Sequence, residues 1–233
     1  MDVNPHVVTL GFFWYIAFLF STVCHEGAHA LAAKLGGDPT ASEAGQVSLN
    51  PLPHIQREPF GLVLVPLISY FLNGWMMGWA SAPYDPNWQR NHPRRAAWMA
   101  LAGPGANGTL MVLAGIGIRA GLWKGIFQLS DHATFTSLVE ATDPERLGFL
   151  ATLLSIFFML NLILMTFNLL PVPPLDGSTG IAVFLPEKTA VRLLDFYRGS
   201  SMGFMGILLA WLVYGKVFHW LAPVAVDLLF MNS

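Results

Sequence analysis

Four long apolar stretches dominate the sequence, and polar segments separate them. They cover residues 7–35, 96–118, 149–170 and 201–231. Each stretch is long enough for an α-helix that crosses the roughly 30 Å hydrocarbon core of a bilayer, because a helix rises about 1.5 Å per residue. Glycines and a proline within positions 36–39 stop the first helix. The pattern predicts a polytopic membrane bundle of α-helices.

Two further segments modify this picture. Residues 60–80 are apolar but contain Pro66, Gly74 and Gly78, so this segment either spans the membrane or enters it and returns. Gln46–Leu49 alternates polar and apolar positions as a strand does, and the two prolines that follow suit an edge strand or an extended loop. The expected fold class is α, with about four to six membrane segments and a short membrane-associated β segment after the first helix.

The remaining polar segments carry weaker signals. Residues 119–148 are mixed in polarity, and we expect a short interfacial helix around residues 123–129. Residues 179–198 suit an amphipathic helix on the membrane surface.

The composition supports a membrane protein and limits its partners. Of 233 residues, 54% are hydrophobic and 11% are charged, whereas soluble domains carry about 25% charged residues. The formal net charge of -2 argues against a nucleic-acid partner. Cys24 is the single cysteine, which excludes an internal disulfide. We expect one domain over residues 1–233, with a first helix that is retained because it lacks the basic start of a signal peptide.

The first apolar stretch contains a motif that carries chemistry. His25 and His29 are four residues apart, and Glu26 directly follows the first histidine. A helical turn takes about 3.6 residues, so both imidazoles project from one face. This spacing suits two nitrogen ligands of one zinc ion, with Glu26 beside them as a general base. The apolar sequence on both sides places this chemistry inside a bilayer.

Asp176 is the candidate for the third ligand. Catalytic zinc usually has three protein ligands and one water molecule. Asp176 follows the stretch 149–170 in the proline-rich run Pro171–Gly177. Irregular backbone of this kind is tolerated at membrane depth only where protein or a cavity surrounds it. Because each ionisable side chain at the bilayer centre costs ~2.5 kcal/mol or more, several of them together indicate a metal site.

Four segments resemble the site-2 protease family of intramembrane zinc metalloproteases, in its compact bacterial-type branch. His25–His29 matches the zinc-binding helix of that family, and Asn168–Gly177 is similar to the second signature, which carries the aspartate ligand. Gly103–Asn107 resembles a Gly-Pro-x-x-Asn element, and Gly45–Ile55 is similar to the strand-rich segment after the zinc helix. No stretch is long enough for the PDZ or nucleotide-sensing domain of larger members.

The resemblance implies peptide-bond hydrolysis within the membrane and one zinc ion per chain, held by His25, His29 and Asp176. It implies that Glu26 takes a proton from the attacking water and passes it to the leaving nitrogen. Asn168 is a candidate to hold the substrate backbone or the developing oxyanion, because amide groups donate hydrogen bonds.

Two other polar residues have two interpretations each. Asn107 either shares the role expected of Asn168 or only bridges helices. His54 either approaches the metal as a gate or spare ligand, or has a structural role in its loop.

The candidate ligands also constrain the direction of the helices. His25, His29 and Asp176 all come late in their segments, so the first and third stretches should run in the same direction. Residues 96–118 cross the membrane between them, so residues 60–80 are expected to enter it and return. Most lysines and arginines then lie on the active-site side, which the positive-inside rule places at the cytoplasm.

Three functions are compared. The first is a zinc metalloendopeptidase of the cell membrane that cuts membrane-spanning protein substrates within the lipid bilayer, as in regulated intramembrane proteolysis. The alternatives are a membrane metal-binding or transport protein, and a proteolytically inactive relative that binds membrane helices. Glu26 favours hydrolysis, because it supplies a general base beside the two histidines. A transport path should place polar groups along the helices, whereas here the polar groups collect at one depth. The sequence leaves the substrate, the regulating signal and the oligomeric state open.

Overall fold

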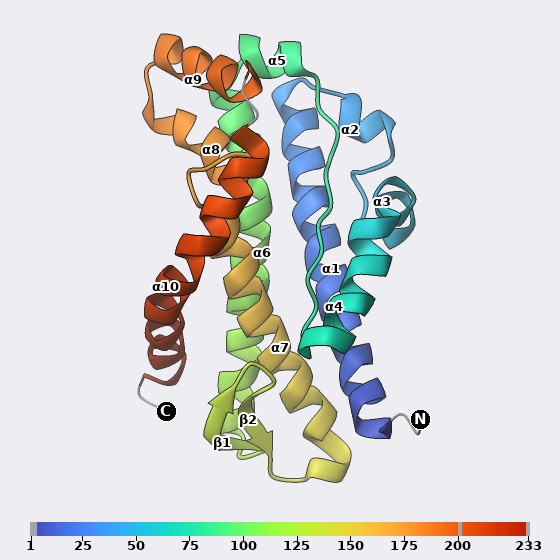
Figure 1. The fold of residues 1–233 in the computed structure, drawn as a ribbon. Coiled ribbons are helices and arrows are strands. Elements are labelled where there is room, and N and C mark those ends of the chain that lie inside the picture. The colour runs from blue at the N-terminus through green and yellow to red at the C-terminus, as the bar shows by residue number, and fades with distance from the viewer. Residues whose placement is uncertain (1–3, 200–201, 232–233) are drawn as a thin grey trace.

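The computed structural model describes residues 4–199 and 202–231. In that part of the chain, four long helices lie side by side as a bundle (Figure 1). They are α1 (Pro5–Gly36), α6 (Pro93–Trp123), α7 (Pro144–Asn168) and α10 (Met202–Phe230). Each is long and apolar enough to cross a membrane. The predicted helical membrane bundle is therefore confirmed.

Shorter elements lie at the two ends of this bundle (Figure 1). Toward one end lie α2 (Thr40–Glu43), α3 (Pro51–Arg57), α5 (Pro86–Asn91), α8 (Asp176–Gly180), a 3-10 turn (Ile181–Phe184) and α9 (Glu187–Gly199). The other end carries an antiparallel hairpin of β1 (Phe127–Thr134) and β2 (Ser137–Ala141). We call these the α5 end and the hairpin end. The amphipathic helix expected over residues 179–198 is present only in its later part, as α9, because the end of α8 and the 3-10 turn occupy the start of that range. The Arg90–Asp195 ion pair joins α9 to α5.

Helix direction agrees with the prediction. Both α1 and α7 run from the hairpin end toward the α5 end, and α6 and α10 run the opposite way (Figure 1). Helix α6 packs against both α1 and α7. Helix α10 leaves most of its surface exposed. Gly37 ends α1 with a positive φ of 97°, a conformation that favours glycine.

Residues 60–80 turn back on themselves, as predicted. A π-helical turn (Phe60–Leu64) and α4 (Val65–Asn73) lead toward the hairpin end, and residues 74–85, here called the return segment, lead back (Figure 1). Glu58 accepts a hydrogen bond from Ser81 Oγ at 2.6 Å, so the two ends of the segment meet. The legs approach closely at Gly61, where any Cβ would collide with the carbonyl of Trp79.

The position of the β structure differs from the prediction. Gln46–Leu49 forms no strand, and the prolines that follow begin helix α3. Asn50 caps this helix by accepting a hydrogen bond from the backbone N–H of Leu52, and Pro51 suits the first helical turn because its missing N–H is not needed there. The Asn-Pro pair therefore signals a helix start.

The hairpin replaces the interfacial helix expected around residues 123–129. Gly125 ends α6 with a φ of 69°, after which β1 begins at Phe127. Strand β2 packs on α7, where the backbone N–H of Leu138 donates to Ser155 Oγ at 3.0 Å. This contact is tertiary, so local polarity could not reveal it.

Cysteine labelling tests the return of residues 60–80. In a Cys24→Ala background, Ser42→Cys and Ser81→Cys should react with an impermeant thiol reagent from the same side of the membrane. Asp131→Cys on the hairpin is the control and should react from the opposite side. Opposite accessibility of positions 42 and 81 would contradict the fold.

Candidate metal centre

Three predicted ligands come together near the α5 end. His25 and His29 project from α1, and Asp176 begins α8. The imidazole Nε2 atoms lie 2.9 Å apart, and the Asp176 carboxylate lies 3.1 Å from His25 Nε2 and 3.3 Å from His29 Nε2. All three ligand atoms lie within 4.8 Å of one another. We call these residues the metal centre.

The loop after α7 delivers Asp176 to the histidines. Successive turns follow the end of α7, with backbone hydrogen bonds from Val172 to Leu170 and from Leu175 to Val172. Gly177 then packs so tightly that a Cβ would collide with the backbone carbonyl of Leu169. The glycine after Asp176 therefore allows the loop to fold back on the end of α7.

Helix α6 passes directly beside the metal centre at Gly103. A Cβ at this position would lie 2.6 Å from His25 Nε2 and closer still to His29 Nε2. A side chain of any size would thus occupy the space next to the ligand atoms. Glycine therefore leaves the space beside the two Nε2 atoms open.

A chain of hydrogen bonds fixes which nitrogen of His25 carries the proton. The Asn161 amide nitrogen donates to the Phe157 carbonyl and to Ser21 Oγ, both at 2.9 Å, so its Oδ1 must accept. This Oδ1 accepts from Asn107 Nδ2 at 2.8 Å, which leaves Asn107 Oδ1 to accept from His25 Nδ1–H at 2.6 Å. Nε2 of His25 therefore carries the lone pair.

His29 has the same tautomer, because its Nδ1–H donates to the Met99 carbonyl at 2.8 Å. When both rings are neutral, two lone pairs and a carboxylate then face one another. Asp176 Oδ2 is buried and has no hydrogen-bond partner among the described residues. These acceptors repel one another unless a proton or a metal ion lies between them, and two imidazole nitrogens with one carboxylate form a set that suits zinc.

Glu26 lies beside this centre. It directly follows His25, is 5% exposed, and interacts electrostatically with His29. The nitrogen ligands are similarly buried, with His25 6% and His29 8% exposed. A carboxylate in this position is suited to accept a proton from a water molecule at the metal.

Asn168 and His54 are not among the three grouped ligands, and their hydrogen bonds go to other residues. Asn168 is half-buried at the end of α7 and donates to the Leu164 carbonyl of its own helix at 2.9 Å, so its catalytic role stays a prediction. His54 is buried, and its Nε2 lies 3.0 Å from the Ser48 carbonyl, which agrees with the structural interpretation.

The hydrogen bonds of Asn107 agree with the interpretation that this residue bridges helices. Its amide N–H groups go to Asn161 and to the Ser21 carbonyl, so neither is left for an oxyanion. Sequence reasoning did not single out Ser21, Asn161 or the space at Gly103. Asn161 could have been found, since it is a polar amide within the apolar stretch 149–170.

Comparison with known proteins gives the family. The model of the family described as "Peptidase family M50" matches residues 13–212. A relative from Bacillus subtilis (strain 168), named "Putative zinc metalloprotease YwhC", is 30% identical over 191 residues, which cover 82% of this chain and 75% of the relative.

A second relative, from Mycolicibacterium smegmatis, is named "Putative zinc metalloprotease Rip2". It is 28% identical over 172 residues, which cover 74% of this chain and 57% of that protein. No solved structure matches the chain significantly. Because the family match extends over most of the chain, this protein belongs to peptidase family M50, the site-2 protease family.

Proposed function

We propose that this protein is an intramembrane zinc metalloendopeptidase that hydrolyses peptide bonds in or near the transmembrane helices of membrane protein substrates. The observation that carries the proposal is the convergence of two imidazole Nε2 atoms and a carboxylate beside Glu26. Membership of a metalloprotease family supports it. The three ligands lie between helices long and apolar enough to cross a membrane, which supports chemistry within the bilayer.

Each residue of the site has a separate role in the proposed hydrolysis. His25 Nε2, His29 Nε2 and the Asp176 carboxylate would hold one zinc ion, which supplies a Lewis acid that lowers the pKa of water. Glu26 accepts the proton of the attacking water and donates it to the leaving nitrogen. Asn168 has two amide N–H groups, so its bond to Leu164 leaves one for a substrate carbonyl.

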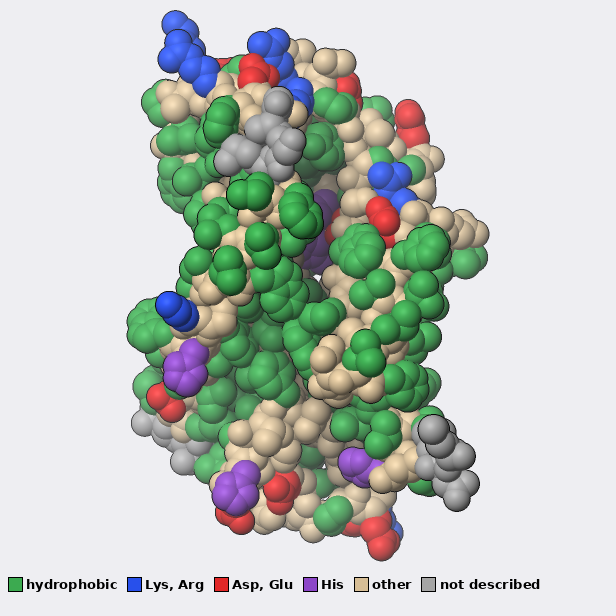
Figure 2. Space-filling model, in the orientation of Figure 1, with side chains coloured by type: hydrophobic (Ala, Val, Ile, Leu, Met, Phe, Trp, Pro, Cys, Tyr) green, Lys and Arg blue, Asp and Glu red, His purple; other side chains and the backbone are tan. Residues whose placement is uncertain are grey.

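The active-site end is proposed to face the cytoplasm. Eight of the 12 lysines and arginines lie in segments toward the α5 end, and three lie toward the hairpin end (Figures 1 and 2). The eight are Lys34, Arg57, Arg90, Arg94, Arg95, Lys188, Arg192 and Arg198, and the three are Arg119, Lys124 and Arg146. An excess of this kind marks the cytoplasmic side of membrane proteins.

Glu26→Gln tests the hydrolytic function. The variant should lose cleavage of single-span helical peptides in detergent by about 10²-fold or more, because the amide cannot transfer the proton. It should retain about one zinc ion per chain, measured by elemental analysis, because Glu26 is not among the ligands. Cleavage at the wild-type rate would favour a metal-binding or transport protein.

Gly103→Ala tests the space beside the ligands. The added Cβ lies against both Nε2 atoms, so we expect zinc binding to fall by at least about 10-fold in competition with a chelator. Gly105→Ala on the same helix is the control, since its Cβ would meet nothing within 4 Å. Equal zinc affinity in the two variants would place the metal elsewhere.

Asn107→Ala and Asn168→Ala separate ligand orientation from substrate contact. Loss of Asn107 frees the His25 ring, so zinc affinity should fall about 10–100-fold. Loss of Asn168 should leave zinc affinity unchanged and lower kcat by about 10²-fold, as loss of an oxyanion donor does. If Asn168→Ala cleaves peptides normally, the residue has no catalytic part.

A further inference from the structure

An apolar cavity of about 480 Å³ lies near the metal centre and takes no part in the mechanism above. Helices α1, α7 and α10, the return segment and the turn of the hairpin all contribute to its wall. Its larger lining side chains include Trp14, Phe18, Met76, Phe135, Phe167 and Tyr214. We call it the aromatic cavity. Its volume falls within the range of about 300–1,000 Å³ that is common for ligand pockets.

The cavity and the metal centre share two helices. Phe18 comes seven residues before His25 on α1, so the near edge of the cavity on this helix lies roughly 10 Å from the ligands along the helix axis. On α7, the lining residue Phe167 directly precedes Asn168. Figure 2 shows histidine side chains deep in an opening on one face of the molecule, with hydrophobic side chains around it.

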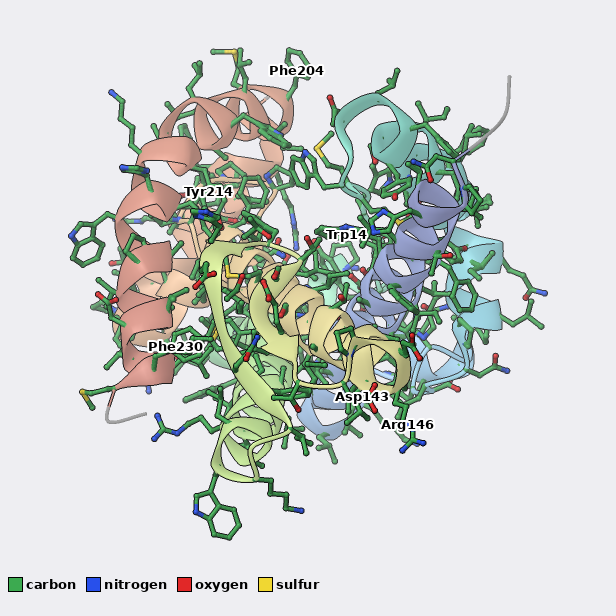
Figure 3. All side chains as sticks on the ribbon, turned by 90° about the horizontal axis from the view of Figure 1, so that it is seen from below. Trp14, Asp143, Arg146, Phe204, Tyr214 and Phe230 are labelled. Carbon is green, nitrogen blue, oxygen red and sulfur yellow. The ribbon has the colours of Figure 1, made fainter. Side chains whose placement is uncertain are left out.

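Aromatic rings from separate elements hold the wall together. The rings of Phe167 and Tyr214 meet edge to face at 5.0 Å, and those of Phe135 and Phe218 lie 5.7 Å apart. Seen from the hairpin end, Trp14 and Tyr214 lie on opposite sides of the space between α1 and α10 (Figure 3). The wall is therefore shaped by contacts between elements and is suited to a large apolar group.

We propose that the aromatic cavity is a specificity pocket for a bulky apolar side chain of the substrate, about three residues from the bond that is cut. The inference rests on the proposed function. An extended segment rises about 3.3 Å per residue, so about three residues cover the roughly 10 Å between the cavity and the metal centre.

Filling the cavity tests the proposal. Gly215 lines it from α10, and a Cβ there would meet nothing within 4 Å, so Gly215→Phe should fold and occupy the pocket. Full-length protein in detergent is given single-span peptides with Phe or Ala at each position up to four residues from the cleaved bond. Wild type should prefer Phe at one position, and Gly215→Phe should reduce the Phe/Ala ratio of kcat/KM about tenfold or more.

Gly203→Phe is the matched control. It lies on the same helix, its Cβ also meets nothing within 4 Å, and it is not part of the cavity wall. Its Phe/Ala ratio should equal that of the wild type. A ratio that Gly215→Phe leaves unchanged would overturn the proposal and is the result expected if a lipid chain fills the cavity.

Failure of the proposed function can be distinguished from failure of the pocket. If wild type and Glu26→Gln both leave every peptide intact, the hydrolytic function fails. The pocket is then tested by binding of fluorescent Phe and Ala peptides to Glu26→Gln protein. The Phe peptide should bind about tenfold more tightly, and Gly215→Phe in this background should remove the difference. Equal Kd values for the two peptides would overturn the pocket.

Discussion

Two imidazole lone pairs and a carboxylate face one another across about 3 Å in a buried site, and the surrounding structure is arranged to hold them there. Neutral imidazole Nε2 atoms and a carboxylate all accept hydrogen bonds, so the arrangement needs a proton or a metal ion between them. Helix α6 approaches the same atoms closely at Gly103, where even a methyl group would lie within 2.6 Å of both Nε2 atoms. The metal centre is thus a constraint on α1, on α6 and on the loop after α7.

Hydrogen bonding extends this constraint across the bundle. In hydrocarbon, polar groups must be satisfied within the protein. The run from the Phe157 carbonyl through Asn161 and Asn107 to His25 satisfies each donor and joins α7, α6 and α1. It also sets the tautomer of His25, so the packing of three helices and the chemistry of one ring depend on the same contacts. The return of residues 60–80 leaves α1 and α7 parallel, which brings both ligand sets to one end.

Local signals in the sequence predicted much of the fold correctly. Apolar runs located the four long helices, and the interruptions at Pro66, Gly74 and Gly78 favoured the return of residues 60–80. The predicted position of the β structure was wrong for two reasons. One is local to the predicted segment, and the other is that the true hairpin depends on tertiary contacts. Asn50 and Pro51 form a helix start that resembles an edge strand in composition. The hairpin depends on contacts with α7, more than ten residues away in sequence, such as that of Leu138 with Ser155.

The sequence by itself determined the membrane class, the pair of histidines on one helical face and the type of residue that completes the centre, because period and residue chemistry are local properties. Only the tertiary structure decided which nitrogens carry protons, which glycine leaves room for the ion and where the aromatic cavity lies. These features arise from atoms of α1, α6, α7 and α10 that meet only after packing. Distances of a few ångströms between separate helices are not encoded in any single stretch of the chain.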